Sequence, residues 1–458
     1  MSIPQSAGGP IGSRDDLVAY IAAGAKPREE WRVGTEHEKF VYCLKTLKPL
    51  PYEAPSPGAP SIRALLNGMK GFGWKPILEG DNIIGLTQDG ASLSLEPGGQ
   101  FELSGAPLES VHGTCAEVTV HRNQVREVCT AIGAGCLGLG FAPTWTLAEM
   151  PLMPKGRYGI MRAYMPKVGG YGHEMMFRTC TVQANFDFGS ESDMVKKLRV
   201  ALALQPVATA LFANSPFREG RPNGFLSYRS HIWTDVDNAR TGMLPFVFED
   251  AFGFERYVDY ALDVPMYFLY RDGRYIDVAG RSFRDFLERR IPEAKEITPM
   301  VSDWADHLTT IFPEARIKQF LEVRGADGGT WRRICGLPAL WTGIFYDQNS
   351  LDAAWDLVKD WTDEEREAMR AAVPKLAFAT PFRNVNVLAL ARKMLDIARQ
   401  GLRARAKLDS SGSNEEGFLQ PLQELADRGY TRAEELLTSY RAEWWGDITK
   451  LFGAYNFL

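Results

Sequence analysis

The chain has 458 residues, of which 45% are apolar and 24% are charged, proportions that are typical of a soluble globular protein. Its formal net charge is −5 and its pI is about 5.8, so no basic excess is present to neutralise nucleic-acid phosphates, and no nucleic-acid partner is expected. No stretch approaches the roughly 18 consecutive apolar residues of a membrane-spanning helix, so no membrane association is expected either.

The cysteines and the first residues suggest a cellular location. Six cysteines lie far apart and form no CxxC pair, which disfavours a zinc site and indicates mostly reduced thiols. Residues 1–13, MSIPQSAGGPIGS, are small and polar and are predicted to be disordered. They lack the basic region and apolar core of a secretory signal, so a cytoplasmic location is predicted. No clear linker follows, and residues 14–458 are predicted to form a single catalytic domain.

The first third of the chain alternates helices and strands. Helices are predicted over 14–24 and 61–70, a strand over 31–43, and a Pro-rich loop over 49–60. A β-meander follows at 83–88, 91–96 and 100–105, because Asp89-Gly90 is a strong hairpin signal. Residues 109–132 have helical periodicity and end at Gly133, and 136–141 is predicted to be a strand.

The remainder of the chain becomes progressively helical. A long strand is predicted at 176–188, a helix from about Ser190 or Ser192 to Phe212, and further strands at 225–233, 264–277 and 316–324. After about residue 330 the chain is predicted to be mainly helical, with segments near 350–372, 386–406, 415–428 and 431–446. A largely antiparallel sheet mixed with many helices is the α+β class.

Several predicted strands carry carboxylates or amides on one face, because side chains two positions apart in a strand point the same way. These residues are Glu36, Glu38, Glu96, Glu102, Gln183 and Glu322. For any one strand, a solvated sheet face is the alternative. Solvated faces are usually rich in Lys and Thr, however, whereas these hold Glu, Gln and Asn. Such oxygen-rich clusters suit magnesium or manganese, and converging carboxylates would repel one another without a cation.

A second set of candidate residues is basic: Lys155, Arg157, Arg162, Arg229 and Arg324. Surface ion pairing is the alternative for any one of them. As a group they could hold a triphosphate and a substrate carboxylate, for which the bidentate fork of arginine is suited. A metal with arginines around a phosphate is typical of phosphoryl transfer.

One short motif is a decoy. Gly133, Gly135 and Gly138 fit GxGxxG, but the dinucleotide fingerprint needs a strand before it and a helix after it, and here the order is reversed. No GxSxG, GxxxxGK[ST] or HExxH motif is present.

Long motifs in a fixed order carry a family resemblance. They include VGTEHEKF, LEPGGQFELSGAP, RTCTVQ, SHIWTD and LEVRGADGG, within a stretch from about residue 14 to 445. The chain resembles glutamate–cysteine ligase of the plant and proteobacterial type. The resemblance implies a glutamine-synthetase-like fold, in which a curved antiparallel sheet forms a funnel surrounded by helices. It also implies ATP-dependent ligation of the glutamate γ-carboxylate to the cysteine amine through a γ-glutamyl phosphate, the first step of glutathione biosynthesis.

The resemblance also implies roles for the candidate residues. The metal ligands would be Glu36, Glu38, Glu96, Glu102, Gln183 and Glu322, binding Mg²⁺ or, as a substitute, Mn²⁺. Arg229 and Arg324 would be catalytic, and Lys155, Arg157 and Arg324 would bind the ATP phosphates. Met176, Cys180, Arg162 and Trp233 would bind substrate. Changing Glu36 or Glu322 to Gln is expected to abolish turnover and leave the fold intact.

Two cysteines resemble a regulatory pair. Plant members are controlled by intrachain disulfides, and Cys115 and Cys335 stand where one such pair occurs. Two free, buried thiols are the alternative. The other plant pair lies near YIDV, where this chain has Val278, so that switch is expected to be absent.

Other functions remain open from sequence alone. A carboxylate–amine ligase with another acceptor amine would share the fold. Paired carboxylates could serve a glycosidase, which would leave the further glutamates and the arginines unexplained. A catalytically inactive binding scaffold is a third alternative. The chain is expected to be a monomer or a homodimer.

Overall fold

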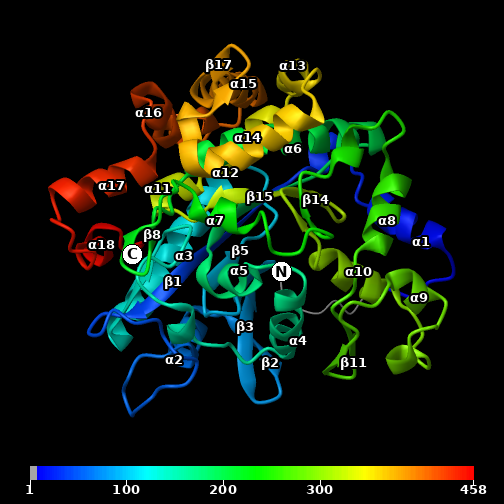
Figure 1. The fold of residues 1–458 in the computed structure, drawn as a ribbon, viewed down its shortest axis with the longest axis horizontal. Helices are drawn as coiled ribbons and strands as arrows, with labels where there is room; N and C mark the ends of the chain where they lie inside the picture. The colour runs from blue at the N-terminus through cyan, green and yellow to red at the C-terminus, as the bar shows by residue number, and fades with distance from the viewer. Residues whose placement is uncertain (1–7) are drawn as a thin grey trace.

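The computed structural model of the protein describes residues 8–458 (Figure 1). Part of the segment predicted to be disordered, residues 1–7, lies outside the described residues. In the remainder, Pro10 forms a β-bridge with Met300, and Ile11 N donates a hydrogen bond of 2.9 Å to Pro299 O. Residues 9–11 are therefore held against residues 299–301. The single catalytic domain over 14–458 stays a prediction.

One large sheet forms the centre of the structure. Its strands run in the order β14-β15-β7-β1-β5-β4-β3-β2, with β6 paired to β1, and every neighbouring pair is antiparallel. The strands are β1 (Val33–Cys43), β2 (Lys75–Glu79), β3 (Asn82–Gln88), β4 (Ala91–Leu95), β5 (Phe101–Ser104), β6 (Ala134–Leu137), β7 (Thr181–Phe186), β14 (Ala315–Ile317) and β15 (Leu321–Asp327).

Helices surround this sheet. The α-helices are α1 (Arg14–Ala22), α2 (Ile62–Met69), α3 (Val111–Ile132), α4 (Gly156–Tyr164), α5 (Gly172–Arg178), α6 (Glu191–Phe212), α7 (Tyr228–Ile232), α8 (Phe254–Asp263), α9 (Phe283–Leu287), α10 (Val301–Thr309), α11 (Trp331–Ile334), α12 (Gly336–Phe345), α13 (Gln348–Val358), α14 (Asp363–Leu376), α15 (Val387–Arg405), α16 (Gln420–Arg428), α17 (Arg432–Ala442) and α18 (Lys450–Ala454).

The remaining strands have two to four residues and form small pairs outside the sheet. They are β8 (Phe217–Arg218), β9 (Arg221–Pro222), β10 (Thr241–Gly242), β11 (Phe268–Arg271), β12 (Arg274–Asp277), β13 (Phe312–Pro313), β16 (Pro381–Phe382) and β17 (Val385–Asn386). No described helix is both long enough and apolar enough to cross a membrane.

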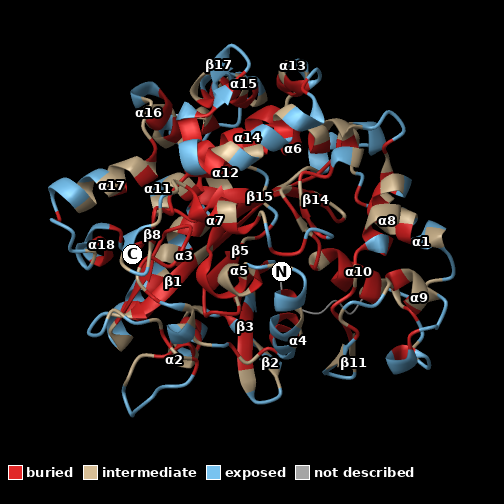
Figure 2. Ribbon diagram, in the orientation of Figure 1, coloured by how far each residue is buried: buried red, intermediate tan, exposed pale blue. Residues whose placement is uncertain are grey.

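The apolar face of the sheet is covered by α6 and α12, which pack on β7 and β15 (Figures 1 and 2). Val182, Ala184 and Phe186 alternate along β7 and are all buried. The Phe186 ring meets the Phe345 ring of α12 edge to face, with centroids 5.3 Å apart. In α6, every residue from 200 to 212 is buried, as is expected for a helix that is apolar all round. The polar face of the strands is thereby left for the site.

Behind this layer, α12 and α15 cross at close range because both carry glycine at the contact. A Cβ atom on Gly401 would lie 1.8 Å from the carbonyl oxygen of Gly343, and a Cβ on Gly343 would lie 2.1 Å from that of Ala398. Only glycine lets the two backbones approach this closely.

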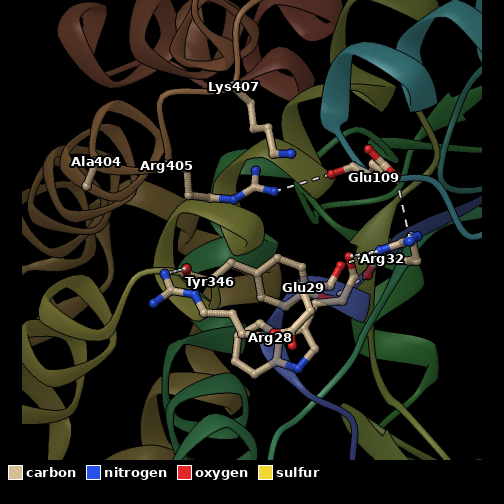
Figure 3. A pocket seen from close by; sticks show the side chains of 9 residues that line it. Arg28, Glu29, Arg32, Glu109, Tyr346, Ala404, Arg405 and Lys407 are labelled. Atoms are coloured by element: carbon tan, nitrogen blue, oxygen red, sulfur yellow. Dashed lines mark hydrogen bonds and ion pairs between the residues drawn. The ribbon is translucent and has the colours of Figure 1, made fainter.

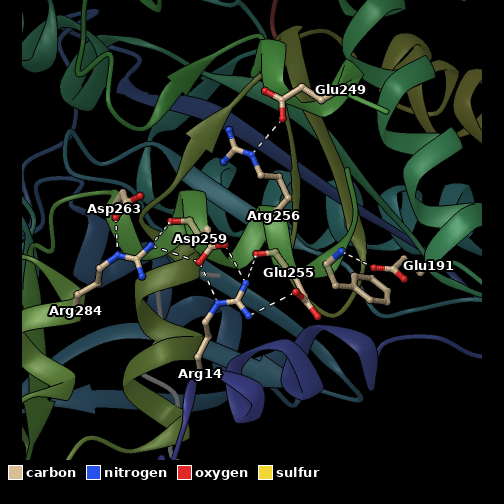
Figure 4. Close-up of polar contacts among 9 residues, drawn as sticks. Arg14, Glu191, Glu249, Glu255, Arg256, Asp259, Asp263 and Arg284 are labelled. Carbon is tan, nitrogen blue, oxygen red and sulfur yellow. Dashed lines mark hydrogen bonds and ion pairs between the residues drawn. The ribbon is translucent and has the colours of Figure 1, made fainter. Parts of the chain in front are cut away.

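An ion-pair network docks α1 onto α8 (Figure 4). Arg14 of α1 contacts Asp259 at 2.9 Å and Glu255 at 3.7 Å, both on α8. Arg284 of α9 reaches Asp259 at 3.5 Å and Asp263 at 2.6 Å. Because these groups are partly exposed, each pair contributes only about 0–1 kcal/mol, and burial of the apolar side of α1 accounts for most of its docking.

Several strand predictions are wrong in part. The segment 264–277 forms the hairpin of β11 and β12 after an irregular start, and 316–324 contains the turn between β14 and β15. Residues 225–233 were expected to form a strand, but Tyr228–Ile232 is a helix that begins where Ser227 Oγ accepts a hydrogen bond from Ser230 N. The strand expected at 176–188 is confined to Thr181–Phe186, because Gly172–Arg178 is helical. An N-cap hydroxyl outweighs the strand propensity of neighbouring aromatic residues.

Candidate active site

The polar face of the sheet brings the predicted carboxylates together in rows. Glu38 of β1 lies opposite Glu102 of β5, and Glu102 lies opposite Ser94 of β4. Two residues before Glu38 in β1, Glu36 lies opposite Gln183 of β7. Side chains that are directly opposite in an antiparallel pair share a face, so the predicted face is present.

The third row joins β15 to the same face. Glu322 lies opposite Asn185 of β7, whose Nδ2 donates a 2.9 Å hydrogen bond to Glu36 Oε1. Asn185 thus links the first strand to a strand nearly 300 residues later in the chain. Glu102 is held by two hydroxyls: Ser104 Oγ donates at 2.6 Å and Ser94 Oγ at 3.0 Å.

Glu38 lies among other acids on this face. Burial and repulsion by Glu96 and Glu102 raise its pKa well above the usual value, against the opposing effects of Arg229 and of the Thr181 backbone N–H, which donates at 3.0 Å. The pKa of a carboxyl rises in this way when like charges converge in a site of low polarity. In this corner, burial and negative charge therefore outweigh the nearby positive charge.

Glu322 has the opposite environment. Its side chain is fully buried, and its carboxylate contacts Arg316 at 2.9 Å, Lys318 at 2.9 Å and Arg324 at 3.3 Å. Although burial alone would raise the pKa of Glu322, these three cations lower it well below the usual value. A carboxylate held by three cations needs no metal to neutralise it. The predicted metal role of Glu322 stays a prediction.

Two of the predicted arginines meet beside a tryptophan. Arg229, Arg324 and Trp233 line one small cavity, and both guanidinium carbons lie over the Trp233 ring, at 5.8 and 5.4 Å from its centre. Arg229 NH2 donates to the Arg324 carbonyl oxygen at 2.9 Å, and its Nε is buried without a partner among the described residues. Burial and the nearby Arg316 lower the pKa of Arg324 to about 10. Closely spaced guanidiniums with an unused donor favour an anion.

Lys155 and Arg157 lie at the start of α4. Burial lowers the pKa of Lys155 to about 8, and the nearby Glu96 partly offsets this. Its Nζ donates to Leu95 O at 2.8 Å. Arg157 lies over the Phe268 ring at 4.8 Å, and its Nε and NH1 have no partner within the described chain. These two cations are therefore next to the acidic corner formed by Glu38, Glu96 and Glu102.

The predicted substrate residues are not all brought to this face. Arg162 is exposed on α4. Met176 is buried on α5, and its carbonyl oxygen accepts from Gln100 Nε2 at 3.2 Å. Cys180 is fully buried in an apolar cluster with Phe40 and Trp145, and burial raises the pKa of its thiol. Of the four residues, only Trp233 lies between the site arginines.

The donors on this face fit a magnesium ion. Among residues 8–458, no three His, Cys, Asp or Glu side chains form a ready-made metal cage. Magnesium, however, usually takes one or two carboxylates and completes its octahedron with water and substrate phosphates. The buried Gln183 Oε1 has no hydrogen-bond partner in the described part of the chain, and it faces the same side as Glu36. Carboxylate and amide oxygens with unused acceptor capacity are the donors that magnesium prefers.

Sequence reasoning missed Arg316 and Lys318, which neutralise Glu322. Both belong to the hairpin of β14 and β15, and Arg316 lies directly opposite Glu322 in its register. The segment 316–324 was treated as one strand, which hides the turn that brings these cations onto the acid. The alternation of charges in ARIKQFLEVR was the available signal.

The pair Cys115 and Cys335 is joined by a disulfide that links α3 to the start of α12. It closes a loop with a sequence separation of 220 residues. The alternative of two free thiols therefore does not hold in this structure, and a regulatory role stays a prediction. The other four cysteines are free.

The chain matches a known protein family. The model of glutamate-cysteine ligase family 2 (GCS2) matches residues 32–454. Glutamate–cysteine ligase B of Oryza sativa subsp. japonica is 56% identical over 441 residues, covering 96% of this chain and 86% of the relative. The enzyme of Arabidopsis thaliana is 55% identical, covering 96% and 82%. A crystal structure of glutamate–cysteine ligase from Francisella tularensis in complex with AMP has a TM-score of 0.53 at 11% identity, covering 93% of this chain and 89% of that one.

The family model and the curated relatives define an ATP-dependent ligase, and the structure builds it on a large antiparallel sheet. The chain belongs to the glutamate–cysteine ligase family 2. The predicted family, α+β fold class and ligase activity are therefore confirmed.

The predicted cytoplasmic location is contradicted. The relatives from Oryza sativa, Nicotiana tabacum and Arabidopsis thaliana are named as chloroplastic enzymes. The expectation rested on the composition of the first residues and on thiol usage, and neither property distinguishes the cytoplasm from another reducing compartment.

Proposed function

We propose that the acidic rows and the arginine pair together form a site where ATP activates the γ-carboxylate of glutamate for attack by the amine of cysteine. The observation that carries this proposal is the juxtaposition on one sheet face. Glu38, Glu96 and Glu102 repel one another there, while Arg229 and Arg324 present donors a few strands away. A site of this kind can take a polyanion and a metal together, which phosphoryl transfer requires.

The reaction proceeds in two displacements. A γ-carboxylate oxygen of glutamate attacks the γ-phosphorus of ATP, the bond to ADP breaks, and γ-glutamyl phosphate forms. The cysteine amine then attacks the acyl carbon, its proton is lost, and the C–O bond to phosphate breaks. Neither displacement needs a protein nucleophile, so positioning of the reactants provides most of the catalysis.

The chain's own residues would position these anions. Arg229 and Arg324 would bind the transferring phosphoryl group or the substrate carboxylate, and the buried Arg229 Nε is a donor available for this purpose. Lys155 and Arg157 would bind the ATP phosphates from the opposite side of the acidic corner. Glu322, through its 3.3 Å contact, would orient Arg324. Trp233 would keep water away from the two guanidiniums.

Glu36, Glu38, Glu96, Glu102 and Gln183 would hold magnesium, or manganese as a substitute. The bound ion would supply positive charge that neutralises the ATP phosphates. Without it, the repulsion that raises the pKa of Glu38 would oppose the binding of a further anion.

The proposal is tested by ADP release from the purified protein with Mg²⁺, ATP, glutamate and cysteine, leaving out each component in turn. Release that needs both amino acids, with γ-glutamylcysteine identified by mass, supports it. Release with glutamate and a different amine, but not with cysteine, would retain the chemistry and overturn the acceptor. Release that is indifferent to glutamate would overturn the proposal.

A matched pair of variants tests the assigned arginine. Arg229→Gln is expected to lower kcat/KM by about 100-fold or more, since loss of one preorganised donor commonly costs that much. Arg256→Gln removes a half-buried arginine of α8 that pairs with Glu249 at 3.4 Å and lies over the Phe246 ring, away from the site, and it should leave turnover unchanged. Equal activity of the two variants would exclude Arg229 from the site.

A further inference from the structure

A second cavity, of about 480 Å³, lies outside the acidic rows (Figure 3). It is bounded by the segment just before β1 and by the end of α15 with the residues that follow it. None of its lining residues is shared with the cavity of Arg229 and Arg324. Its volume is in the range of cavities that take small organic ligands.

The floor of this cavity is aromatic. The rings of Trp31 and Tyr346 have centroids 4.9 Å apart. Lys197, fully buried behind them, places its Nζ 3.6 Å from the centre of the Trp31 ring. The Tyr346 hydroxyl donates to the Arg32 carbonyl oxygen and accepts from Asp187 N at 2.7 Å. The floor is therefore fixed before any ligand arrives, which lowers the entropy cost of binding.

The walls carry an excess of positive charge. Four cations line the cavity, Arg28, Arg32, Arg405 and Lys407, against two carboxylates, Glu29 and Glu109. Two of the cations are already paired. Arg405 contacts the fully buried Glu415, and Arg32 lies 3.7 Å from Glu109.

The other two cations have no carboxylate partner in the described chain. Arg28 donates only to the Tyr346 carbonyl oxygen, and no contact of the Lys407 ammonium is drawn in Figure 3. They line the cavity from two different segments, Arg28 before β1 and Lys407 after α15. Two unneutralised cations facing one cavity match the charge of a dianion, and arginine in particular suits a phosphate.

We propose that this cavity is a binding site for a small phosphorylated aromatic compound, held with its phosphate between Arg28 and Lys407 and its ring against Trp31 and Tyr346. The ligand class follows from the combination of an aromatic floor and two cations on the walls that have no carboxylate partner in the described chain. Neither a simple anion nor a neutral aromatic compound would use both features. The site is independent of the acidic rows and does not rest on the proposed reaction.

Phenyl phosphate is the simplest probe because it has one ring and one phosphate dianion. Binding to the full-length protein would be measured by calorimetry and by tryptophan fluorescence, with Trp31→Phe to identify the reporting ring. The test variant is Arg28→Gln/Lys407→Gln. Both residues are exposed, so the fold should be kept. Lys375→Gln, at an exposed lysine of α14 outside the cavity, is the matched control.

The expected result is saturable binding at one site, about 100-fold or more weaker in the double variant and unchanged in the control, because each of the two charged contacts to phosphate contributes about tenfold or more. Inorganic phosphate should bind more weakly than phenyl phosphate, and the ligase turnover of the double variant should equal that of the wild type. Equal binding by the double variant and the wild type would overturn the proposal. So would the absence of saturation at millimolar phenyl phosphate, or equal affinity for the two anions.

Discussion

Glu322 offers a direct separation of a structural role from a catalytic one. Its side chain is completely buried, and three cations contact its carboxylate within 3.3 Å. The change Glu322→Gln keeps the volume and removes the charge, so Arg316, Lys318 and Arg324 would lose the one carboxylate that contacts all three. Glu322→Gln is therefore expected to fold but to be less stable than the wild type.

The size of the effect follows from the geometry. Breaking a buried ion pair by neutralising one partner costs about 3–5 kcal/mol. At about 2.1 cal/mol/K per residue, the unfolding entropy of 458 residues is about 1 kcal/mol/K. Glu322→Gln should therefore lower Tm by about 3–5 °C.

Glu36→Gln is the matched control. Glu36 lies on the same face but accepts only one hydrogen bond, from the neutral amide of Asn185. A glutamine can keep that contact, although Lys318 and Arg324 lose a longer-range attraction to Glu36, so Tm should fall by less than in Glu322→Gln while turnover falls. Differential scanning calorimetry of both variants, at one scan rate and without ligands, makes the comparison. Equal Tm shifts in the two variants would refute the view that the three cations depend on Glu322.

Three further predictions concern other parts of the chain. Burial lowers the pKa of His307 to about 4, against about 6.5 when unfolded. The unfolded chain therefore binds more protons between these values, and up to about 3 kcal/mol of stability is lost as the pH falls from 6.5 to 4. His307→Gln should flatten the curve of Tm against pH between about pH 4 and 6.5. An unchanged curve would contradict the view that His307 causes the loss of stability. Gly401→Ala should lower Tm markedly, because its Cβ would lie 1.8 Å from Gly343 O. Gly453→Ala is the control and should leave Tm unchanged, because the space around Gly453 is open. Similar Tm values for the two variants would argue against the close crossing of α12 and α15. Arg324→Lys should lower kcat/KM about 100-fold, because an ammonium cannot reproduce a bidentate fork, and wild-type kinetics would remove Arg324 from the site.

The central strands could be predicted from sequence because their pattern is local. Alternation in 31–43 predicted the shared face of Glu36 and Glu38, and the Asp89-Gly90 turn predicted the hairpin of 83–88 and 91–96. The register that sets Glu38 opposite Glu102 could not be predicted. It depends on which strands become neighbours, and residues far apart in sequence decide this.

Two of the helices that the sequence analysis did not predict were missed for different reasons. Phe254–Asp263 buries Phe254, Tyr257, Val258, Ala261 and Leu262, a regular helical spacing that was available and overlooked. Gly156–Tyr164 begins with glycine and carries mixed polar residues, so its sequence gives little periodic signal.

Neither the cations of the second cavity nor those around Glu322 could be predicted from the sequence. The cavity lined by Arg28 and Lys407 joins segments nearly 380 residues apart, and no local sequence pattern indicates it. The triad of cations around Glu322 likewise needs the turn between β14 and β15 to be placed correctly.

The most direct measurement follows oxygen from the substrate. Glutamate labelled with ¹⁸O in its γ-carboxylate is incubated with ATP, Mg²⁺, cysteine and the protein, and the released phosphate is analysed by mass spectrometry. If the carboxylate is phosphorylated before the amine attacks, each phosphate should carry one labelled oxygen. Unlabelled phosphate released together with γ-glutamylcysteine would contradict activation through an acyl phosphate.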